Sequence, residues 1–341
     1  MLRIERDYSL LGHNTFGIDA RTAAFVEYGS ENELLEAAEM LRASRLPSPW
    51  LHIGGGSNLL FTKDWPGTVL HSRINGVEPL HEDGEQAVVR VGSGVVWDDF
   101  VAMCVERGWY GAENLSAIPG EIGAAAVQNI GAYGMEVKDL ILRVETLNVE
   151  NGEIRVFEAA ECGYGYRRSI FKQPDNKKYV VLSVTFRLGL RPHFNLGYKA
   201  LADALVTRSD ISLRDVRDAV ISVRSSKLPD PAVIGSAGSF FTNPVVSGAR
   251  LQELQRQWPA VPFYELHDGE GSVKLSAGWL IEQCGWKGRS LGRAGVYGKQ
   301  ALVLVNLGGA EGAEVQALAE AVRSDVRSRF GVDLHPEVNI L

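Results

Sequence analysis

The stretch Pro119–Gly134, PGEIGAAAVQNIGAYG, decides how the rest of the sequence is interpreted. Eight of its sixteen residues are glycine or alanine, and only one is charged. Side chains this small let a backbone approach a neighbour closely, and that neighbour is either another helix or a flat ligand. In the second case, Gln128 and Asn129 would offer amide donors and acceptors to a planar cofactor. This stretch alone leaves both interpretations open.

A second glycine-rich stretch is HIGGGSN, His52–Asn58, in which a short apolar strand runs into three glycines. Successive N–H groups in such a turn bind an anion, most often a phosphate. The spacing is neither that of a P-loop nor that of the Rossmann fingerprint, and a plain tight turn is the alternative. Together, the two stretches favour a large, flat, phosphorylated ligand such as a dinucleotide.

The composition is that of an ordinary globular protein, with 341 residues, 45% apolar and 23% charged, enough for two or three domains. The sequence contains neither an apolar run of membrane-spanning length nor a signal-peptide pattern, so we expect a cytoplasmic protein. Three dispersed cysteines indicate reduced thiols, and the scattered histidines suggest no metal site. The net charge of −7 argues against nucleic acid as the main partner.

Hydrophobic periodicity predicts both helices and strands, and therefore an α+β protein with at least two domains. The segment SENELLEAAEMLRAS predicts a helix with a capping box, in which Ser30 caps the helix and Glu33 reaches back. A further helix is expected from about Trp97 to a stop at Gly108.

Later segments give equally local signals. Asn151-Gly152 between two alternating runs predicts a β-hairpin, and a helix is expected to start around Ser212. A long terminal helix, EVQALAEAVRSDVRSRFG, should end at Gly331. The tail VDLHPEVNIL reads as a strand. One side of the terminal helix is expected to consist of Val315, Leu318, Ala319, Val322 and Val326.

Three further motifs admit a structural and a functional interpretation. Gly163–Lys172, GYGYRRSIFK, is either a solvated turn or a clamp for an anion, because guanidinium groups bind carboxylates bidentately. Ser239 lies in a glycine-flanked apolar turn, where it is either a turn residue or a hydroxyl in a dry site. Glu337, in HPEV, is either an exposed edge residue or a buried carboxylate with a function.

Nine motifs occur in the order found in the UDP-N-acetylenolpyruvylglucosamine reductase (MurB) family, which the chain resembles from Asn14 to Val338. They are NTFGI, GGGSN, IPGEIGAAAVQNIGAYG, YRRSIFK, KLPDP, GSAGSFFTNP, KLSAGWLIEQ, QALVLVN and PEV. The segment PFYELHDGEGSVKLSAGW resembles the insert of the longer, type I branch.

The resemblance implies an α+β fold of the FAD-binding, vanillyl-alcohol oxidase (PCMH) type, with two flavin subdomains and a separate substrate-binding domain. Their expected bounds are 1–72 together with the C-terminal strand 331–341, then 73–208, and finally 209–330. It also implies the reaction. NADPH reduces non-covalently bound FAD, and reduced FAD converts UDP-N-acetylglucosamine enolpyruvate to UDP-N-acetylmuramate in peptidoglycan synthesis. We expect a monomer without a metal, a nucleic-acid partner or a membrane partner.

The chemistry explains which catalytic groups such an enzyme needs. Addition of hydride to the terminal carbon of the substrate pushes a second negative charge onto its carboxylate, and this charge requires a cation and a hydrogen-bond donor in a dry site. By similarity, Arg167 is the cation, Glu337 is the neighbouring acid in a protonated or proton-sharing state, and Ser239 donates a proton to the carbon that bears the ether oxygen.

The resemblance assigns the remaining contacts residue by residue. The residues expected to bind FAD are Gly54, Gly55, Gly56, Ser57, Asn58, Ile118, Pro119, Gly120, Gly123, Ala124, Val127, Ile130, Val181 and Arg224. Those expected to bind the substrate are Tyr133, Tyr198, Lys227, Asn243, Tyr264 and Gln300. Some members of the family carry serine where this chain has Ala124, so a hydroxyl contact to the flavin would be missing here.

Two other functions remain compatible with the motifs. One is a flavin enzyme of the same fold that acts on a small alcohol or lactone. Such enzymes usually tether FAD through histidine or cysteine, and only His52 flanks the glycine turn. The other is a non-catalytic nucleotide-binding regulator, which would not give a yellow protein that NADPH bleaches.

Overall fold

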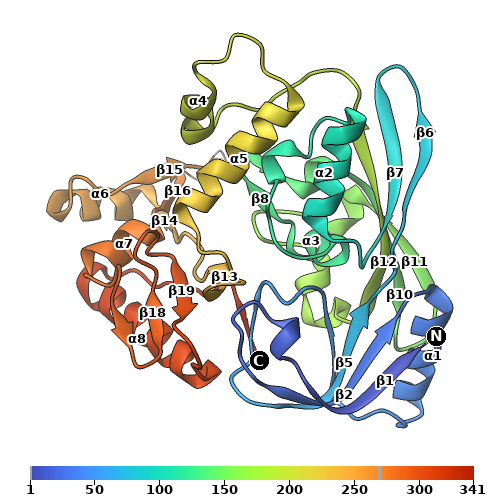
Figure 1. Cartoon of the computed structure of the whole chain (residues 1–341). Helices are drawn as coiled ribbons and strands as arrows, with labels where there is room; N and C mark the ends of the chain where they lie inside the picture. The colour runs from blue at the N-terminus through green and yellow to red at the C-terminus, as the bar shows by residue number, and fades with distance from the viewer. Residues whose placement is uncertain (1, 267–270) are drawn as a thin grey trace. The chain divides into compact units, whose positions relative to one another are not determined.

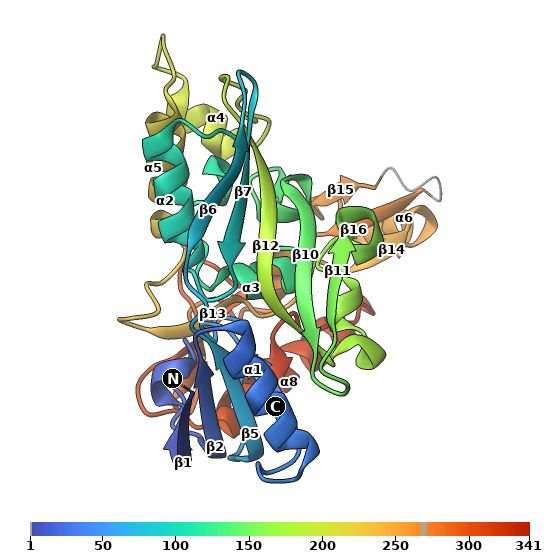
Figure 2. The same ribbon diagram turned by 90° about the vertical axis from the view of Figure 1, so that its right-hand side faces the viewer.

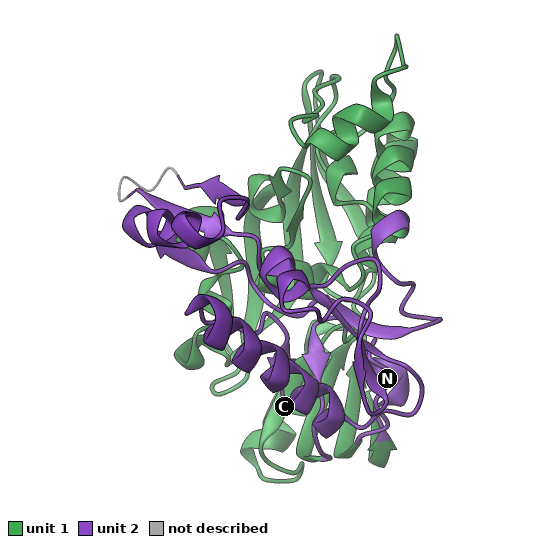
Figure 3. Cartoon of the chain, turned by 90° about the vertical axis from the view of Figure 1, so that its left-hand side faces the viewer, with its two compact units in different colours: residues 1–8, 21–56, 65–225 green, residues 9–20, 57–64, 226–341 purple. Residues whose placement is uncertain are grey.

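The computed structural model describes residues 2–266 and 271–341. The described chain divides into two compact units, each assembled from segments that are distant in sequence (Figure 3). Unit 1 consists of residues 1–8, 21–56 and 65–225, and unit 2 of residues 9–20, 57–64 and 226–341. The predicted division into three subdomains stays a prediction.

The first sheet of unit 1 has the strand order β1-β2-β5-β3, and β2, β5 and β3 are parallel. Figure 1 labels β1, β2 and β5 of this sheet. The strands are β1 Arg3–Ser9, β2 Arg21–Tyr28, β5 Trp65–Ser72 and β3 Trp50–Ile53. Helix α1, Glu31–Arg42, supplies Leu34, Ala37 and Ala38 to a core that also contains Val26. Because parallel strands end at the same edge of a sheet, the loops after β2, β5 and β3 lie close together.

The second sheet of unit 1 has the order β11-β10-β12-β7-β6, and Figure 2 shows these strands side by side. They are β11 Ile154–Glu158, β10 Ile141–Asn148, β12 Tyr179–Gly189, β7 Gln86–Gly92 and β6 Val77–Glu82. The helices of this part are α2 Trp97–Arg107, α3 Ile122–Gln128, α4 Lys199–Leu205 and α5 Leu213–Lys227. A short hairpin is formed by β8 Gly131–Ala132 and β9 Met135–Glu136. The buried core under this sheet includes Trp97 and Phe100 of α2 and Phe186 of β12.

Unit 2 contains one sheet ordered β13-β19-β18-β17 and another ordered β14-β16-β15. Their strands are β13 Gly235–Ser239, β19 Val303–Asn306, β18 Ala294–Val296, β17 Ser290–Leu291, β14 Val245–Ser247, β16 Ser272–Leu275 and β15 Phe263–Glu265. The helices are α6 Gly248–Gln257, α7 Ala277–Gln283 and α8 Gly312–Phe330. The C-terminal strand β20, Asn339–Ile340, pairs in parallel with β4, Leu59–Leu60.

Most of the predicted elements are confirmed, with one correction at the first helix. Ser30 caps α1 by accepting a hydrogen bond from the Glu33 N–H at 3.3 Å. However, the Glu33 carboxylate accepts its bond from the N–H of Gly29 at 2.8 Å. Glu33 therefore does reach back, but to the residue before the cap. The backbone of Ser30 itself is extended, as is usual for a residue that caps a helix.

The helix stops and the hairpin are also confirmed. Gly108 and Gly331 end α2 and α8 with left-handed φ values of 69° and 59°. Strands β10 and β11 pair as a hairpin around Gly152, whose φ is 81°. All five apolar residues expected on one side of the terminal helix are buried. The expected strand in the tail is reduced to β20 and an isolated bridge at Pro336. Residues 267–270 of the type I-like insert lie outside the described residues.

Candidate functional site

The glycine turn follows β3 directly and lies against the small-residue stretch. A Cβ atom built on Gly54 would lie 3.0 Å from the Cβ of Ala124, and one on Gly55 would lie 3.4 Å from the Cα of Gly120. Gly56 has a left-handed φ of 66°. Larger side chains would separate the two segments. Both stretches are therefore rich in small residues because their backbones approach each other closely.

Helix α3 buries one face and leaves the other partly exposed. Ile122, Ala125 and Ala126 are buried in the core of unit 1, whereas Ala124 and Val127 are only partly buried. The helix-packing interpretation is therefore correct for one face. On the other face, Ala124 lies adjacent to Gly54.

The loop Gly163–Lys172 is fixed to the end of α3 by several hydrogen bonds. Ser169 donates its hydroxyl to the carbonyl of Val127 at 2.6 Å, and Asn129 donates its amide to the carbonyl of Gly165 at 2.8 Å. Lys172 donates to the side-chain oxygen of Gln128 at 3.0 Å. The predicted anion clamp and the small-residue stretch thus form one local structure.

Arg167 belongs to a cationic cluster beside this loop. Its Nη2 donates to the carbonyl of Gly131 at 3.1 Å. Burial lowers the pKa of the nearby Arg224, and the charge of Arg167 lowers it further, while Tyr133 contributes a hydrogen bond that raises it. The rings of Tyr133 and Tyr198 pack edge to face, with centroids 5.1 Å apart. Two guanidinium groups and two phenols suit an anionic ligand.

Helix α5, which carries Arg224, is held by an ion pair to α2. Arg217 donates to both carboxylate oxygens of Asp98, at 2.7 and 2.9 Å. Burial would raise the pKa of Asp98, but hydrogen bonds from Arg217 and from the N–H of Ala117 outweigh it and lower the pKa. This pair fixes the position of Arg224 within unit 1.

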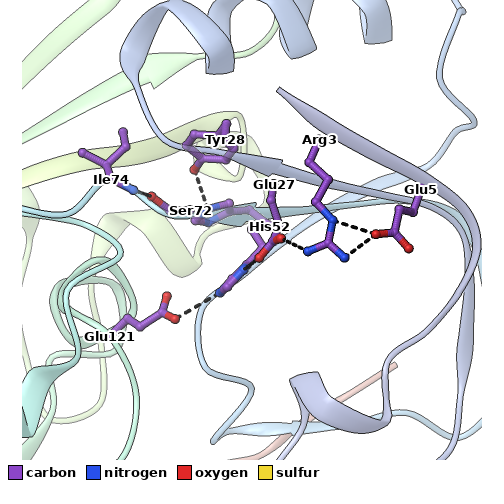
Figure 4. Close-up of polar contacts among 9 residues, drawn as sticks. Arg3, Glu5, Glu27, Tyr28, His52, Ser72, Ile74 and Glu121 are labelled. Carbon is purple, nitrogen blue, oxygen red and sulfur yellow. Dashed lines mark hydrogen bonds and ion pairs between the residues drawn. The ribbon is translucent and has the colours of Figure 1, made fainter. Parts of the chain in front are cut away.

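A histidine near the end of β5 connects the carboxylates of Glu27 and Glu121. Figure 4 labels these two acidic residues. The Nδ1 atom of His71 lies 3.1 Å from Oε1 of Glu27, and its Nε2 atom lies 3.0 Å from Oε1 of Glu121. Both ring nitrogens must then donate, as they do only in the imidazolium form. Burial would lower the pKa of His71, but hydrogen bonds and charge from Glu121 and Glu27 outweigh it and raise the pKa. Arg3 in turn donates to Glu27 at 2.5 Å.

In unit 2, Ser239 ends β13 after a β-bulge. Ser236 is opposite Val305 of β19 and Ser239 is opposite Val303, so β13 contains one extra residue. Gly238, at the bulge, has a φ of 70°. A bulge of this kind changes the direction of the following side chain, and here that side chain is Ser239.

Glu337 lies on the segment next to Ser239. Its N–H donates to the carbonyl of Phe240 at 2.8 Å, and Pro336 forms a bridge with Phe241. Asn58 donates its amide to the carbonyl of Glu337 at 3.2 Å. Two of the three predicted catalytic residues are therefore brought together within unit 2, while Arg167 belongs to unit 1.

Two of the predicted substrate contacts lie at the start of α7. The side-chain oxygen of Asn243 accepts a hydrogen bond from the N–H of Ala277 at 3.0 Å. The side-chain oxygen of Gln300 lies close to Gly278, since a Cβ atom built on that glycine would be 3.1 Å from it. Lys227 is exposed at the end of α5. Tyr264, on β15, is 59% exposed, as a residue that closes over a ligand would be.

The other predicted FAD contacts occupy varied environments. Val181 is buried in the core, whereas Ile118 and Ile130 pack at its margin. Pro119 is exposed, and Ser57 is partly buried. These assignments stay predictions.

The chain is similar to known proteins over its whole length. A family model described as an FAD binding domain matches residues 22–158, and one described as the C-terminal domain of UDP-N-acetylenolpyruvoylglucosamine reductase matches residues 230–341. The chain is 58% identical to that reductase from Bacteroides fragilis (strain YCH46), over 99% of this chain and 100% of the relative. It is 52% identical to the reductase from Porphyromonas gingivalis (strain ATCC 33277), over 99% of each chain. The solved structure of the Thermus caldophilus reductase (MurB) covers 100% of this chain and 99% of its own, with a TM-score of 0.68 at 24% identity, and supports the fold.

The fold and these matches define an FAD-dependent oxidoreductase with an α+β fold of the vanillyl-alcohol oxidase type. More specifically, the chain belongs to the UDP-N-acetylenolpyruvoylglucosamine reductase family. It uses NADPH and FAD to reduce UDP-N-acetylglucosamine enolpyruvate to UDP-N-acetylmuramate for peptidoglycan synthesis. Family membership rules out the oxidase and regulator alternatives. In the described part of the chain, no helix has the length and apolarity to span a bilayer.

The residues of unit 1 fit FAD. Side chains at Gly54 and Gly55 would fill the space beside Ala124 and Gly120, where a flat dinucleotide needs close access to the backbone. Sequence reasoning missed one part of this region, the pair His71 and Glu121. A signal was available, because a histidine that follows the apolar residues Val69 and Leu70 in a strand-like run needs a polar partner when it is buried.

Proposed function

We propose that Arg167, Glu337 and Ser239 carry out the reduction of the enolpyruvyl group, and that the glycine turn and α3 hold FAD. When bound, FAD supplies the hydride that NADPH delivers. The observation that supports this proposal is the bulge at Gly238, directly before Ser239, together with the backbone hydrogen bond from Glu337 to the next residue, Phe240. A serine and a carboxylate on neighbouring, hydrogen-bonded segments suit a site that protonates a carbon next to a carboxylate.

Arg167 stabilises the charge that develops on the substrate carboxylate. A fixed guanidinium contributes most where water is excluded, because its position requires no reorganisation during the reaction. The hydrogen bond to Gly131 and the contact of the guanidinium with the ring of Tyr166, at 5.6 Å, support such fixation. Glu337, protonated or sharing a proton with the substrate, donates a hydrogen bond to the same carboxylate.

Ser239 gives its proton to the carbon that bears the ether oxygen. A serine hydroxyl is a weak acid, but the enediolate-like form of the substrate is a strong enough base to accept its proton. Loss of a positioned general acid typically slows the step by a factor of about 10²–10⁴.

The UDP portion binds to residues outside the reacting centre. Tyr198, Lys227 and Asn243 contact the diphosphate, while Gln300 contacts another part of the substrate. Tyr264 closes over the bound molecule. NADPH and the UDP sugar use the same site in turn, which predicts ping-pong kinetics.

We also propose that the protein is a cytoplasmic monomer. Its substrate and NADPH are soluble metabolites, and its charge of −7 opposes self-association. Sedimentation equilibrium should give about the chain mass of 37.2 kDa, and a stable dimer would contradict the proposal.

The test is anaerobic stopped-flow measurement of the two half-reactions in Ser239→Ala. Flavin reduction by NADPH should remain within about threefold of wild type, whereas reoxidation by the UDP enolpyruvyl sugar should slow by about 10²–10⁴. Ser239→Cys should be less impaired, because a thiol also delivers a proton. Ser236→Ala, on the same strand, is the control. Equal slowing of both half-reactions would contradict the assigned role of Ser239.

A further inference from the structure

Glu121 carries a buried carboxylate oxygen that lacks a donor. The residue is 9% exposed, and its Oε1 is bound by His71. Among the residues that the structure describes, its Oε2 has no hydrogen-bond partner. A buried acceptor without a donor is destabilising, and more so when it carries charge, so such an oxygen indicates a ligand.

This oxygen faces the glycine turn. Oε2 of Glu121 would lie 3.2 Å from a Cβ on Gly54, which is the position that glycine leaves open. The Cβ of Ala124, one turn further along the same stretch, would lie 3.0 Å from the same position. The carboxylate thus lies where the two segments assigned to FAD approach each other.

Two residues of the first sheet, His71 and Glu27, fix the orientation of this carboxylate. His71 and Glu27 are directly opposite each other in the register of β5 and β2, and His71 is opposite Ile53, the last residue of β3 before Gly54. With Nδ1 held by Glu27, the imidazole presents Nε2 to Glu121 in one orientation. The chain of three side chains therefore starts in the sheet and ends beside the glycine turn.

The charge of this group limits what it can bind. A carboxylate only accepts hydrogen bonds, and it repels the anionic oxygens of a diphosphate. Its partner must therefore donate a hydrogen bond and carry no negative charge. An uncharged O–H or N–H of the dinucleotide meets both conditions. Examples are a hydroxyl of its polyol or ribose and an N–H of one of its ring systems.

We propose that Glu121 accepts a hydrogen bond from an uncharged O–H or N–H donor of FAD, and that His71, braced by Glu27, is its positioning residue. This inference rests on the proposed assignment of the glycine turn and α3 to FAD. It adds two residues to that binding site, and one of them does not touch the cofactor.

The test is calorimetric titration of the full-length chain, freed of its flavin, with FAD, FMN and ADP. Glu121→Ala should weaken FAD binding by about 10- to 100-fold, the effect of losing a hydrogen bond to a charged group. An equal loss with FMN assigns the donor to the flavin half, and an equal loss with ADP assigns it to the adenosine half. The control is Glu113→Ala, which removes another buried carboxylate of unit 1, one that accepts from the N–H of Gly111.

The positioning role of His71 is tested by a double-mutant cycle. His71→Gln should weaken FAD binding by about 5- to 20-fold in the wild-type background and by less than about twofold in Glu121→Ala, because coupled residues are not additive. Additive losses would overturn the positioning role. Should Glu121→Ala not fold, Glu121→Gln keeps the volume and removes the charge, and its FAD binding should weaken by at least about threefold.

Two negative results are distinguishable. If the wild-type chain binds FAD and Glu121→Ala binds it as tightly as wild type, or if Glu121→Ala and Glu113→Ala weaken binding equally, this inference fails and the proposed function stands. If the wild-type chain does not bind FAD, the assignment of the glycine turn and α3 to the cofactor fails first.

Discussion

Arg167 has a left-handed backbone, with a φ of 54°, although it is not glycine. Asn129 and Tyr133, in the small-residue stretch, also have positive φ values of 46° and 49°. Each such residue costs about 1–2 kcal/mol and persists only where the surroundings enforce it. Three residues with positive φ in one local structure indicate that orienting these side chains lowers the stability of unit 1.

The His71 cluster predicts a specific pH dependence of stability. The groups that face His71 are Glu27 from β2, Glu121 before α3 and His52 from β3, with Arg3 behind Glu27. Burial lowers the pKa of His52 to about 3, so this residue adds no positive charge. Because folding raises the pKa of His71, its contribution is complete below the unfolded value of about 6.5 and is lost as pH rises through the folded value.

Urea denaturation of wild type and His71→Gln at several pH values measures this contribution. The difference in free energy of unfolding should be largest near pH 6 and should shrink steadily toward alkaline pH. His81→Gln is the matched control, because His81 also contacts a carboxylate, Asp83, but its side chain is 59% exposed. A difference that stays constant with pH, or that grows toward alkaline pH, would contradict a protonated His71.

At the scale of elements, the bulge in β13 connects backbone conformation to chemistry. Gly238 has a φ of 70°, and a Cβ built on it would meet no atom within 4 Å. Alanine at this position is therefore disfavoured by conformation and not by space. The expected strain is about 1–2 kcal/mol, and the strand can relieve it by losing the bulge.

Gly238→Ala should therefore slow reoxidation of the flavin by substrate by about 10- to 100-fold, because a catalytic group displaced by about 1 Å loses that much activity. Reduction of the flavin by NADPH should change little. Gly285→Ala is the matched control, since Gly285 has a φ of 77° and also has open space around it. If both variants slow reoxidation equally, general strain and not the orientation of Ser239 explains the effect.

Elements with strong local signals could be predicted from the sequence. The terminal helix has apolar residues on one side and a glycine stop, and the hairpin has an Asn-Gly turn, so both signals come from neighbouring residues. By contrast, β4 and β20 are two residues each and form through the pairing of Leu59 with Asn339 and of Leu60 with Ile340. Nothing near either strand in sequence indicates that partner.

The candidate site was only partly predictable for the same reason. The motifs identified the small-residue stretch, the Gly163–Lys172 loop and Ser239, because each carries unusual residue types. The sequence could not indicate that Ser169 and Asn129 tie the loop to α3. It also could not indicate that His71 is opposite Glu27, because strand register depends on tertiary pairing.

At the scale of the whole molecule, each unit combines segments that are distant in sequence. Unit 2 takes residues 9–20 and 57–64 in addition to 226–341. Asn306, on β19, donates to the carbonyl of Phe16 at 2.9 Å, and a Cβ on Gly312 would lie 1.7 Å from the carbonyl oxygen of Phe61. These close contacts show how segments that are distant in sequence pack within one unit.

The central claim is that Arg167, Glu337 and Ser239 act on the same substrate. The most direct measurement is a crystal structure of the protein with FAD and the UDP enolpyruvyl sugar. The account predicts that Arg167 and Glu337 lie within about 3.2 Å of the substrate carboxylate and that the Ser239 hydroxyl contacts the carbon bearing the ether oxygen. The account would be contradicted if the substrate is bound and any of these three side chains lies more than about 6 Å, two hydrogen-bond lengths, from the substrate atom it is predicted to contact.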